Sequence, residues 1–203
     1  MTHDLKLHTR RLFLLSGAAC LTLPVIGCAI TAAPRETFDL TAAQTDRVRR
    51  ASSRTLVITR PISVQTYETE RVVVRSAGGV LSYLPKAQWS DSLPVLIQTR
   101  LLETFENAAF KNVGRPSDQL SVDVTLATEI RAFEIDTTST PPQASVKLSA
   151  KLVNERRGSI FASAVFSATV PLQRTVDVGA IASLDSALHD VALQILSWSA
   201  KSA

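Results

Sequence analysis

The sequence predicts an α+β fold, a single domain in which an antiparallel β-sheet has two main α-helices packed on one face. Two patterns carry this prediction. Three long segments between residues 120 and 170 alternate apolar with polar side chains, as half-buried strands do. Two other segments repeat apolar residues at three- and four-residue spacing, the period of an amphipathic helix. The length of 203 residues fits one domain.

Residues 1–27 are expected to be a lipoprotein signal peptide that lies outside the fold. A basic start precedes an apolar run over residues 12–26, which is shorter than the roughly 20 residues of a membrane-spanning helix. The run ends in Val25-Ile26-Gly27-Cys28, which resembles the lipobox of bacterial lipoproteins. We therefore expect Cys28 to carry diacylglycerol and an acyl chain such as palmitate, with residues 28–36 as the lipidated tether.

Cys20 is the weaker candidate for lipidation because no aliphatic residue stands three positions before it. The export route stays open between the general secretory pathway and the twin-arginine pathway, whose motif the run Thr9–Leu15 resembles. Ala29, which follows Cys28, differs from the aspartate that retains enteric lipoproteins in the inner membrane. The expected location is therefore the periplasmic face of the outer membrane rather than of the inner one.

Composition argues against several classes of protein. The net charge of +4 is too small to indicate nucleic-acid binding without a clustered basic face. After signal removal His189 is the only imidazole, and we expect it to be a surface or partly packed residue. Glu129, Glu134 and Asp136 are spaced too unevenly along one strand for a shared metal or acid–base site. The sequence therefore predicts no catalytic residue, no metal site and no cofactor apart from the lipid on Cys28.

The predicted domain, residues 37–203, begins with short strands. Thr37–Leu40 is a candidate first strand, and the apolar run Leu56–Ile58 is typical of a buried one. The polar stretch between them, Thr41–Arg54, contains four arginines. A solvated loop or short helix is the favoured interpretation of this stretch, and contact with anionic lipid headgroups is the alternative.

A β-hairpin is expected next, because two β-branched segments, residues 71–75 and 80–83, flank the turn pair Gly78-Gly79. Pro85 is expected to end its second strand. A helix then begins near Leu93, where Ser90-Asp91-Ser92 offer N-cap oxygens and a proline follows in the first turn.

Three strands and a last helix complete the domain. Apolar residues alternate from Leu120 to Ile135, with a change of phase that predicts a β-bulge near Arg131-Ala132. Alternation resumes over residues 144–152 and 160–170 on either side of a turn. The helix expected over residues 177–200 has one apolar face and would cover the apolar side of these strands.

Tyr83 and Trp89 form the candidate partner interface, since aromatic side chains are frequent hot spots of protein–protein contacts. The favoured alternative is structural, with Trp89 packing at the start of the helix and Tyr83 filling the core.

The order of these motifs is specific enough to compare with known families. The segments concerned are the lipobox, Arg54–Pro61, Arg71–Ser76, Leu81–Pro85, Gln88–Leu93, Phe133-Glu134 and the helix that ends near Trp198. Over residues 36–200 this order resembles the ABC-type transport auxiliary lipoprotein family, the relatives of paraquat-inducible protein C. The most specific element is the block from Tyr83 to Trp89 before the helix.

The resemblance implies a non-enzymatic accessory lipoprotein of an MCE-type ABC transporter that moves phospholipids across the cell envelope. Its expected partners are an MCE-domain protein and the ABC permease and ATPase, with the lipid anchor in the membrane and no nucleic acid. A homo-oligomer is left open. The alternative is an envelope assembly or scaffold lipoprotein that is not tied to an ABC transporter.

Overall fold

The computed structural model describes residues 34–45, 54–110, 112–172 and 176–202. The chain divides into two units, Met1–Ala32 and Ala33–Ala203, and every described residue belongs to the second. The predicted signal peptide with Cys20 and Cys28 lies outside the described residues, as do Arg47, Arg49 and Arg50. Within the described ranges, no helix combines the length and the apolar character needed to cross a membrane.

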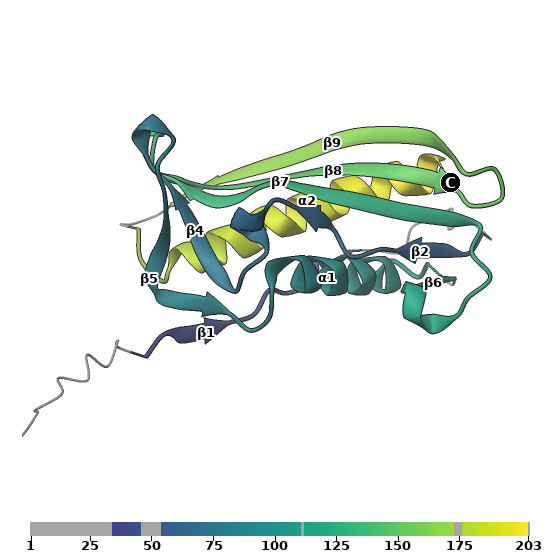
Figure 1. Ribbon diagram of the computed structural model, residues 1–203, viewed down its shortest axis with the longest axis horizontal. Coiled ribbons are helices and arrows are strands. Elements are labelled where there is room, and N and C mark those ends of the chain that lie inside the picture. The colour runs from purple at the N-terminus through teal and green to yellow at the C-terminus, as the bar shows by residue number, and fades with distance from the viewer. Residues whose placement is uncertain (1–33, 46–53, 111, 173–175, 203) are drawn as a thin grey trace, which may run out of the picture. The chain divides into compact units, whose positions relative to one another are not determined.

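The described residues of the second unit form strands, two long α-helices and three short 3-10 helices (Figure 1). In chain order they are β1 Glu36–Phe38, β2 Leu56–Ile58, β3 Ile62–Ser63, η1 Gln65–Tyr67, β4 Arg71–Arg75, η2 Ala77–Gly79, β5 Leu81–Trp89, α1 Leu93–Asn107, β6 Val113–Gly114, η3 Pro116–Asp118, β7 Val124–Asp136, β8 Gln143–Asn154, β9 Ser159–Pro171 and α2 Ala180–Ser202.

Strand β7 is the centre of the sheet. One of its edges pairs antiparallel with β8, which in turn pairs antiparallel with β9. The other edge pairs with β2, β3 and β4 in succession, all of them parallel to β7. The sheet continues from β4 through β5 to β1, and from β2 to β6.

The single α+β domain with two main helices is confirmed, whereas the purely antiparallel sheet is wrong. The strands that run parallel to β7 are only two to five residues long. An apolar run of that length shows burial but carries no information about which neighbour it pairs with, or in which direction.

The predicted β-bulge in the long strand is present. The register between β7 and β8 shifts between Ile130 and Ala132. The shift lets Ile130 and Phe133 both face the interior, where their exposed fractions are 2% and 1%. The bulge thus keeps β7 packed against the core on both sides of the change in phase.

The hairpin of β4 and β5 also agrees with the prediction, except at its proline. Gly78 and Gly79 have φ values of 72° and 77°, a region that glycine enters without a clash from Cβ. The expectation that Pro85 ends the second strand is wrong, since β5 runs on to Trp89. Pro85 has no N–H to donate, and it falls where the pairing of β5 with β4 is irregular.

Helix α1 begins at Leu93 with Pro94 in its first turn, as predicted. Ser92 occupies the N-cap position but makes no side-chain cap hydrogen bond, so the expected N-cap oxygen is not used there. The apolar stripe predicted for this helix is buried, and its residues are Leu93, Ile97, Leu101, Phe105 and, at the C-cap, Ala108. Leu96 and Leu102 are also buried.

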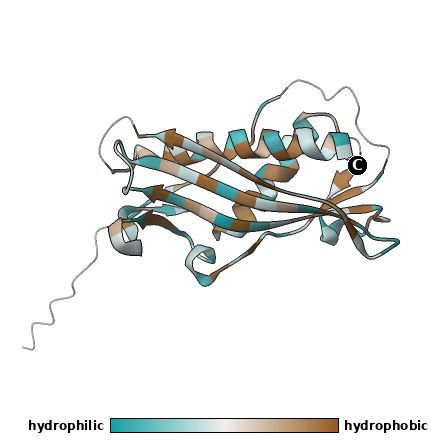
Figure 2. Ribbon diagram, turned by 90° about the horizontal axis from the view of Figure 1, so that it is seen from above, coloured by the Kyte–Doolittle hydropathy of each residue, from teal (hydrophilic) through white to brown (hydrophobic). Residues whose placement is uncertain are grey.

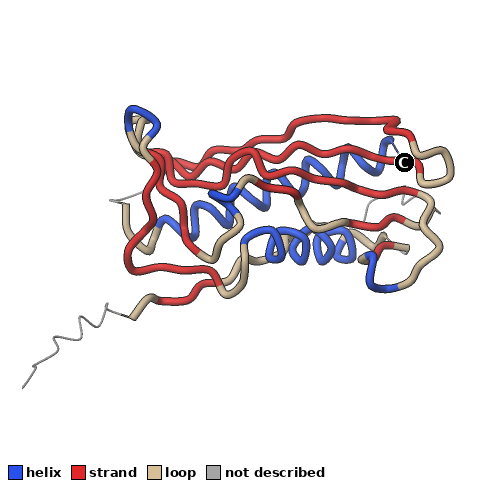
Figure 3. The backbone as a smooth tube through the Cα atoms, in the orientation of Figure 1, coloured by secondary structure: helices blue, strands red, loops and turns tan. Residues whose placement is uncertain are grey.

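Helix α2 lies along β8 and β9 and covers the apolar side of the antiparallel strands (Figures 1 and 3). The strands alternate between apolar and polar residues in Figure 2, and the alternating apolar side chains of β8 from Ala144 to Leu152 are fully buried. The buried face of α2 consists of Ala180, Ile181, Leu184, Ala187, Leu188, Val191, Ala192, Ile195, Leu196 and Ser199. This packing forms the core that positions every surface feature below.

Candidate functional site

The segment that follows β1 forms an ion pair with α1 and hydrogen bonds with α2. Asp39 forms an ion pair with Arg100 of α1, with 2.7 Å between the carboxylate oxygen and the guanidinium nitrogen. Burial raises the pKa of Asp39, but the hydrogen bond and charge of Arg100 contribute to holding it below its ordinary value. The N–H and hydroxyl of Thr41 donate to the two carboxylate oxygens of Asp185 on α2, at 2.7 and 2.6 Å. We call this group, with His189, the N-terminal clamp.

His189 belongs to this clamp rather than to a catalytic arrangement. Its Nε2 atom lies 2.8 Å from the hydroxyl oxygen and 3.0 Å from the carbonyl oxygen of Thr41. The same atom is 3.6 Å from the carboxylate of Asp185. The ring is partly packed, and its contacts hold the chain after β1 against α2. In the part of the chain that the structure describes, no group of three His, Cys, Asp or Glu residues is placed to hold a metal ion.

The turn of the β4–β5 hairpin exposes apolar side chains. Val80, Leu81 and Tyr83 are 60%, 42% and 43% exposed, and we call them the hairpin patch. The guanidinium carbon of Arg71 lies 4.9 Å from the centre of the Tyr83 ring, a cation–π contact that orients the ring on the surface. Exposed apolar residues that lie together in this way are typical of interaction surfaces.

Of the two aromatic residues in the candidate interface, the structure brings only Tyr83 to the surface. Trp89 is 1% exposed and packs edge-to-face on Phe133, with 5.8 Å between ring centroids. This placement matches the structural alternative for Trp89, at the start of α1. A partner that contacts Trp89 would have to displace part of the core.

A buried carboxylate supports the base of the hairpin patch. Glu134 of β7 is 4% exposed, and it accepts hydrogen bonds from the Tyr67 hydroxyl at 2.7 Å and from Arg75 of β4. A second bond from Arg75 measures 3.0 Å. The hydrogen bond with Glu134 raises the pKa of Arg75, so its guanidinium group stays charged. This cluster links β4 and η1 to β7 through the side chain of Glu134.

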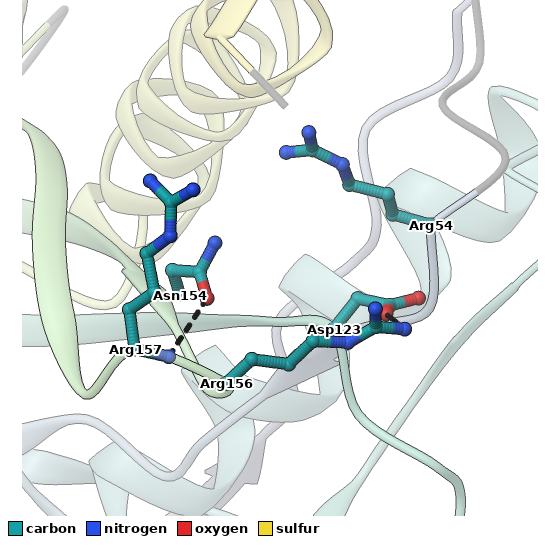
Figure 4. Close-up of a pocket in the computed structure, with 5 residues that line it drawn as sticks. All are labelled: Arg54, Asp123, Asn154, Arg156 and Arg157. Carbon is teal, nitrogen blue, oxygen red and sulfur yellow. Dashed lines mark hydrogen bonds and ion pairs between the residues drawn. The ribbon is translucent and has the colours of Figure 1, made fainter.

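Three arginines line a polar cavity at the opposite end of the sheet (Figure 4). Its volume is about 420 Å³, and its lining residues are Arg54, Asp123, Asn154, Arg156 and Arg157. We call it the arginine site. Arg54 precedes β2, Asp123 precedes β7, and the others lie in or beside the turn between β8 and β9.

Strand β9 forms an uncharged edge of the sheet. Among the described strands it pairs only with β8, and none of its thirteen residues is charged. Ile160, Phe161 and Val165 are each at least 40% exposed. On the side of α2, Phe166 packs on Trp198 at the mouth of an apolar groove of about 480 Å³.

Sequence reasoning missed the arginine site and the edge of β9. For the adjacent residues Arg156 and Arg157, the sequence predicts only that they lie in a turn. Their position beside Arg54 depends on the pairing of β2 with β7, which local patterns do not reveal. The absence of charge along β9 is visible in the sequence, and it could have indicated an edge strand without the charged residues that usually prevent pairing with another strand.

Most of the described unit matches a known protein family. The family model described as the ABC-type transport auxiliary lipoprotein component matches residues 38–196, nearly all of the described unit. The chain belongs to this family of ABC-type transport auxiliary lipoproteins. The family is an accessory one in transport, and its lipoprotein character indicates association with the cell envelope. The resemblance found in the order of the sequence motifs is thereby confirmed at the level of the family.

Known relatives of this auxiliary lipoprotein agree in fold. A solved structure from Xanthomonas campestris has a TM-score of 0.76 at 23% identity, over 82% of this chain and 95% of that one. An uncharacterized protein has a TM-score of 0.64 at 12% identity, over 81% of this chain and 98% of that one. A Bradyrhizobium diazoefficiens protein, also uncharacterized, is 29% identical over 171 residues. That alignment covers 82% of this chain and 45% of the relative, so the chain spans less than half of that relative's length.

Proposed function

We propose that this protein is a membrane-anchored, non-enzymatic accessory lipoprotein of an MCE-type ABC transporter that moves phospholipids across the cell envelope. The observation that carries the proposal is the family match over residues 38–196. The placement of the polar side chains supports a docking role, because His189 and Glu134 are both engaged in holding the fold. The hairpin patch offers a surface through which a partner protein can bind.

The anchor is proposed to be the acylated Cys28, in the outer membrane. Glu36 lies eight positions after Cys28, and an extended chain spans at most about 3.6 Å per residue. The tether would therefore reach about 29 Å at most. A domain on so short a tether stays close to the membrane that anchors it, so the transporter components have to reach it there.

The lipid anchor is tested by substitution of the cysteine. We expect the Cys28→Ala variant to lose labelling by an alkyne analogue of palmitate in the native host and to leave the membrane fraction. The matched control is Cys20→Ala, which should keep both the label and the outer-membrane density of the wild type. Acyl labelling that survives in Cys28→Ala would overturn the assignment of the lipobox.

The docking surface is tested by co-purification. We expect the tagged wild type to recover an MCE-domain protein together with the permease and ATPase, and Tyr83→Ala to reduce this recovery about tenfold. Leu120→Ala is the matched control because Leu120 is similarly exposed, at 41%, outside the hairpin. Tyr83→Ala is preferable to Trp89→Ala, since loss of the buried indole would destabilise the domain by about 3–5 kcal/mol.

Two results would contradict these proposals. Undiminished recovery with Tyr83→Ala would exclude the hairpin patch as the interface. Absence of transporter proteins from the wild-type eluate, together with absence of their genes from the neighbourhood of this gene, would favour a scaffold lipoprotein that acts without an ABC transporter.

A further inference from the structure

The arginine site concentrates positive charge around a concave surface. Three of its five lining residues are arginines, and Asp123 is its single carboxylate. Positive side chains on neighbouring loops repel one another, and the repulsion is stronger in a concavity than on an open surface. An anion between them would relieve that repulsion.

Asp123 is already occupied by other contacts. One of its carboxylate oxygens accepts a hydrogen bond from the N–H of Thr55 at 3.0 Å. The other accepts one from the guanidinium of Arg156, also at 3.0 Å. Asp123 therefore neutralises Arg156 in part.

The turn between β8 and β9 holds its arginines in a defined position. The N–H of Arg157 donates to the side-chain oxygen of Asn154 at 3.1 Å and to its carbonyl oxygen at 3.3 Å. Gly158 closes the turn with a φ of 59°. Figure 4 shows the guanidinium groups of Arg54 and Arg157 and the side-chain amide of Asn154 extending toward the same space.

We propose that Arg54, Arg156 and Arg157, together with the amide group of Asn154, bind a phosphate group. Guanidinium groups match the geometry of phosphate because they donate two parallel hydrogen bonds to its oxygens. Several such groups around one space suit an anion with several acceptor oxygens. The phosphate is that of a phospholipid headgroup or free inorganic phosphate, which present the same chemistry.

The position of the site indicates which lipid it would meet. Figure 1 shows β1 and the β8–β9 turn at opposite ends of the second unit. The arginine site therefore lies at the end of this unit that is remote from β1, where the tether from Cys28 would join the domain. A headgroup bound there is proposed to be one that a transporter component presents. The lipid source rests on the proposed function, whereas phosphate binding itself does not.

The test is calorimetric titration of the full chain in a nonionic detergent at low salt. The probes are glycerophosphoglycerol, which is a phospholipid headgroup without acyl chains, and inorganic phosphate. We expect binding to weaken about tenfold in Arg157→Gln and in Arg156→Gln, because each loses a charge-assisted hydrogen bond. Arg131→Gln is the matched control, since Arg131 is an exposed arginine of β7 outside the site. It should bind as the wild type does.

Each outcome decides the proposal. Tighter binding of glycerophosphoglycerol supports a lipid headgroup, and equal or tighter binding of inorganic phosphate supports a free phosphate. Absence of binding of both probes at millimolar concentration overturns the site, as does binding that Arg157→Gln and Arg131→Gln weaken equally. Neither result bears on the co-purification test, so failure of this site and failure of the proposed function remain distinguishable.

Discussion

At the scale of single residues, the most constrained group is the carboxylate of Glu134. Its burial would cost several kcal/mol if it lacked partners, so the carboxylate depends on the hydrogen bonds from Arg75 and Tyr67. Tyr67 of η1 and Arg75 of β4 are close in the sequence, whereas Glu134 of β7 is about sixty residues away from both. The cluster therefore connects the strand that pairs with Tyr83 to the central strand of the sheet.

Titration of Tyr67 provides a test of this cluster. Burial and then the hydrogen bond to Glu134 raise the pKa of Tyr67 from 10.0 to about 12. A raised pKa in the folded state gives a stabilisation that is complete below pH 10 and is lost as the pH rises through about 12. We expect the free energy of unfolding of the wild type to fall across this interval.

The variant Tyr67→Phe should lack that part of the fall and should lose about 1–3 kcal/mol at pH 7. Urea unfolding at a series of pH values measures both effects. Tyr83→Phe is the control and should keep the alkaline dependence of the wild type. An identical dependence in Tyr67→Phe would show that the hydrogen bond to Glu134 is not the cause.

At the scale of secondary-structure elements, α2 closes the core, whereas β9 forms an edge of the sheet. The buried face of α2 closes the core over β8, whose alternating apolar side chains from Ala144 to Leu152 are inaccessible to solvent. Strand β9 also packs against α2 but leaves its outer edge unpaired among the described strands. Natural edge strands are usually guarded by charge or proline, and β9 has only Pro171 at its last position.

The role of α2 predicts a position-dependent loss of stability. Ile195 is fully buried, whereas Ser197 is exposed on the other face two residues later. We expect Ile195→Ala to lower the free energy of unfolding by about 2–5 kcal/mol through lost packing and a residual cavity. Ser197→Ala should change it by less than about 0.5 kcal/mol. Equal losses in urea unfolding would mean that α2 does not close the core in solution.

At the scale of the whole molecule, the sequence predicts the elements in which buried residues recur at a regular spacing. The stripe from Leu93 to Phe105 locates α1, and the change of phase near Arg131 locates the bulge, because burial on one face repeats along each element. The parallel pairing of β2, β3 and β4 with β7 is not predictable in this way. It depends on contacts between residues far apart in the sequence.

The same limit applies to the candidate site. The sequence singles out Tyr83 and Trp89 as aromatic residues on the segment that leads into α1, but alternation alone cannot show that Tyr83 faces outward while Trp89 faces the core. The hairpin twist and the irregular pairing around Pro85 decide that difference. The arginine site needs three loops to converge, so it emerges only once the topology is known.

The N-terminal clamp has a consequence for the strength of docking. Because hydrogen bonds hold Thr41 on α2, the residues after Glu36 do not lengthen the tether between Cys28 and the domain. A lipid anchor on Cys28 would therefore confine the domain to a thin layer at the membrane surface. Short linkers of this kind give effective concentrations in the millimolar range for a partner that reaches the same layer. A contact of modest affinity would therefore be largely occupied at the bilayer. The natural interface of this domain can be small and readily reversible and still be occupied most of the time.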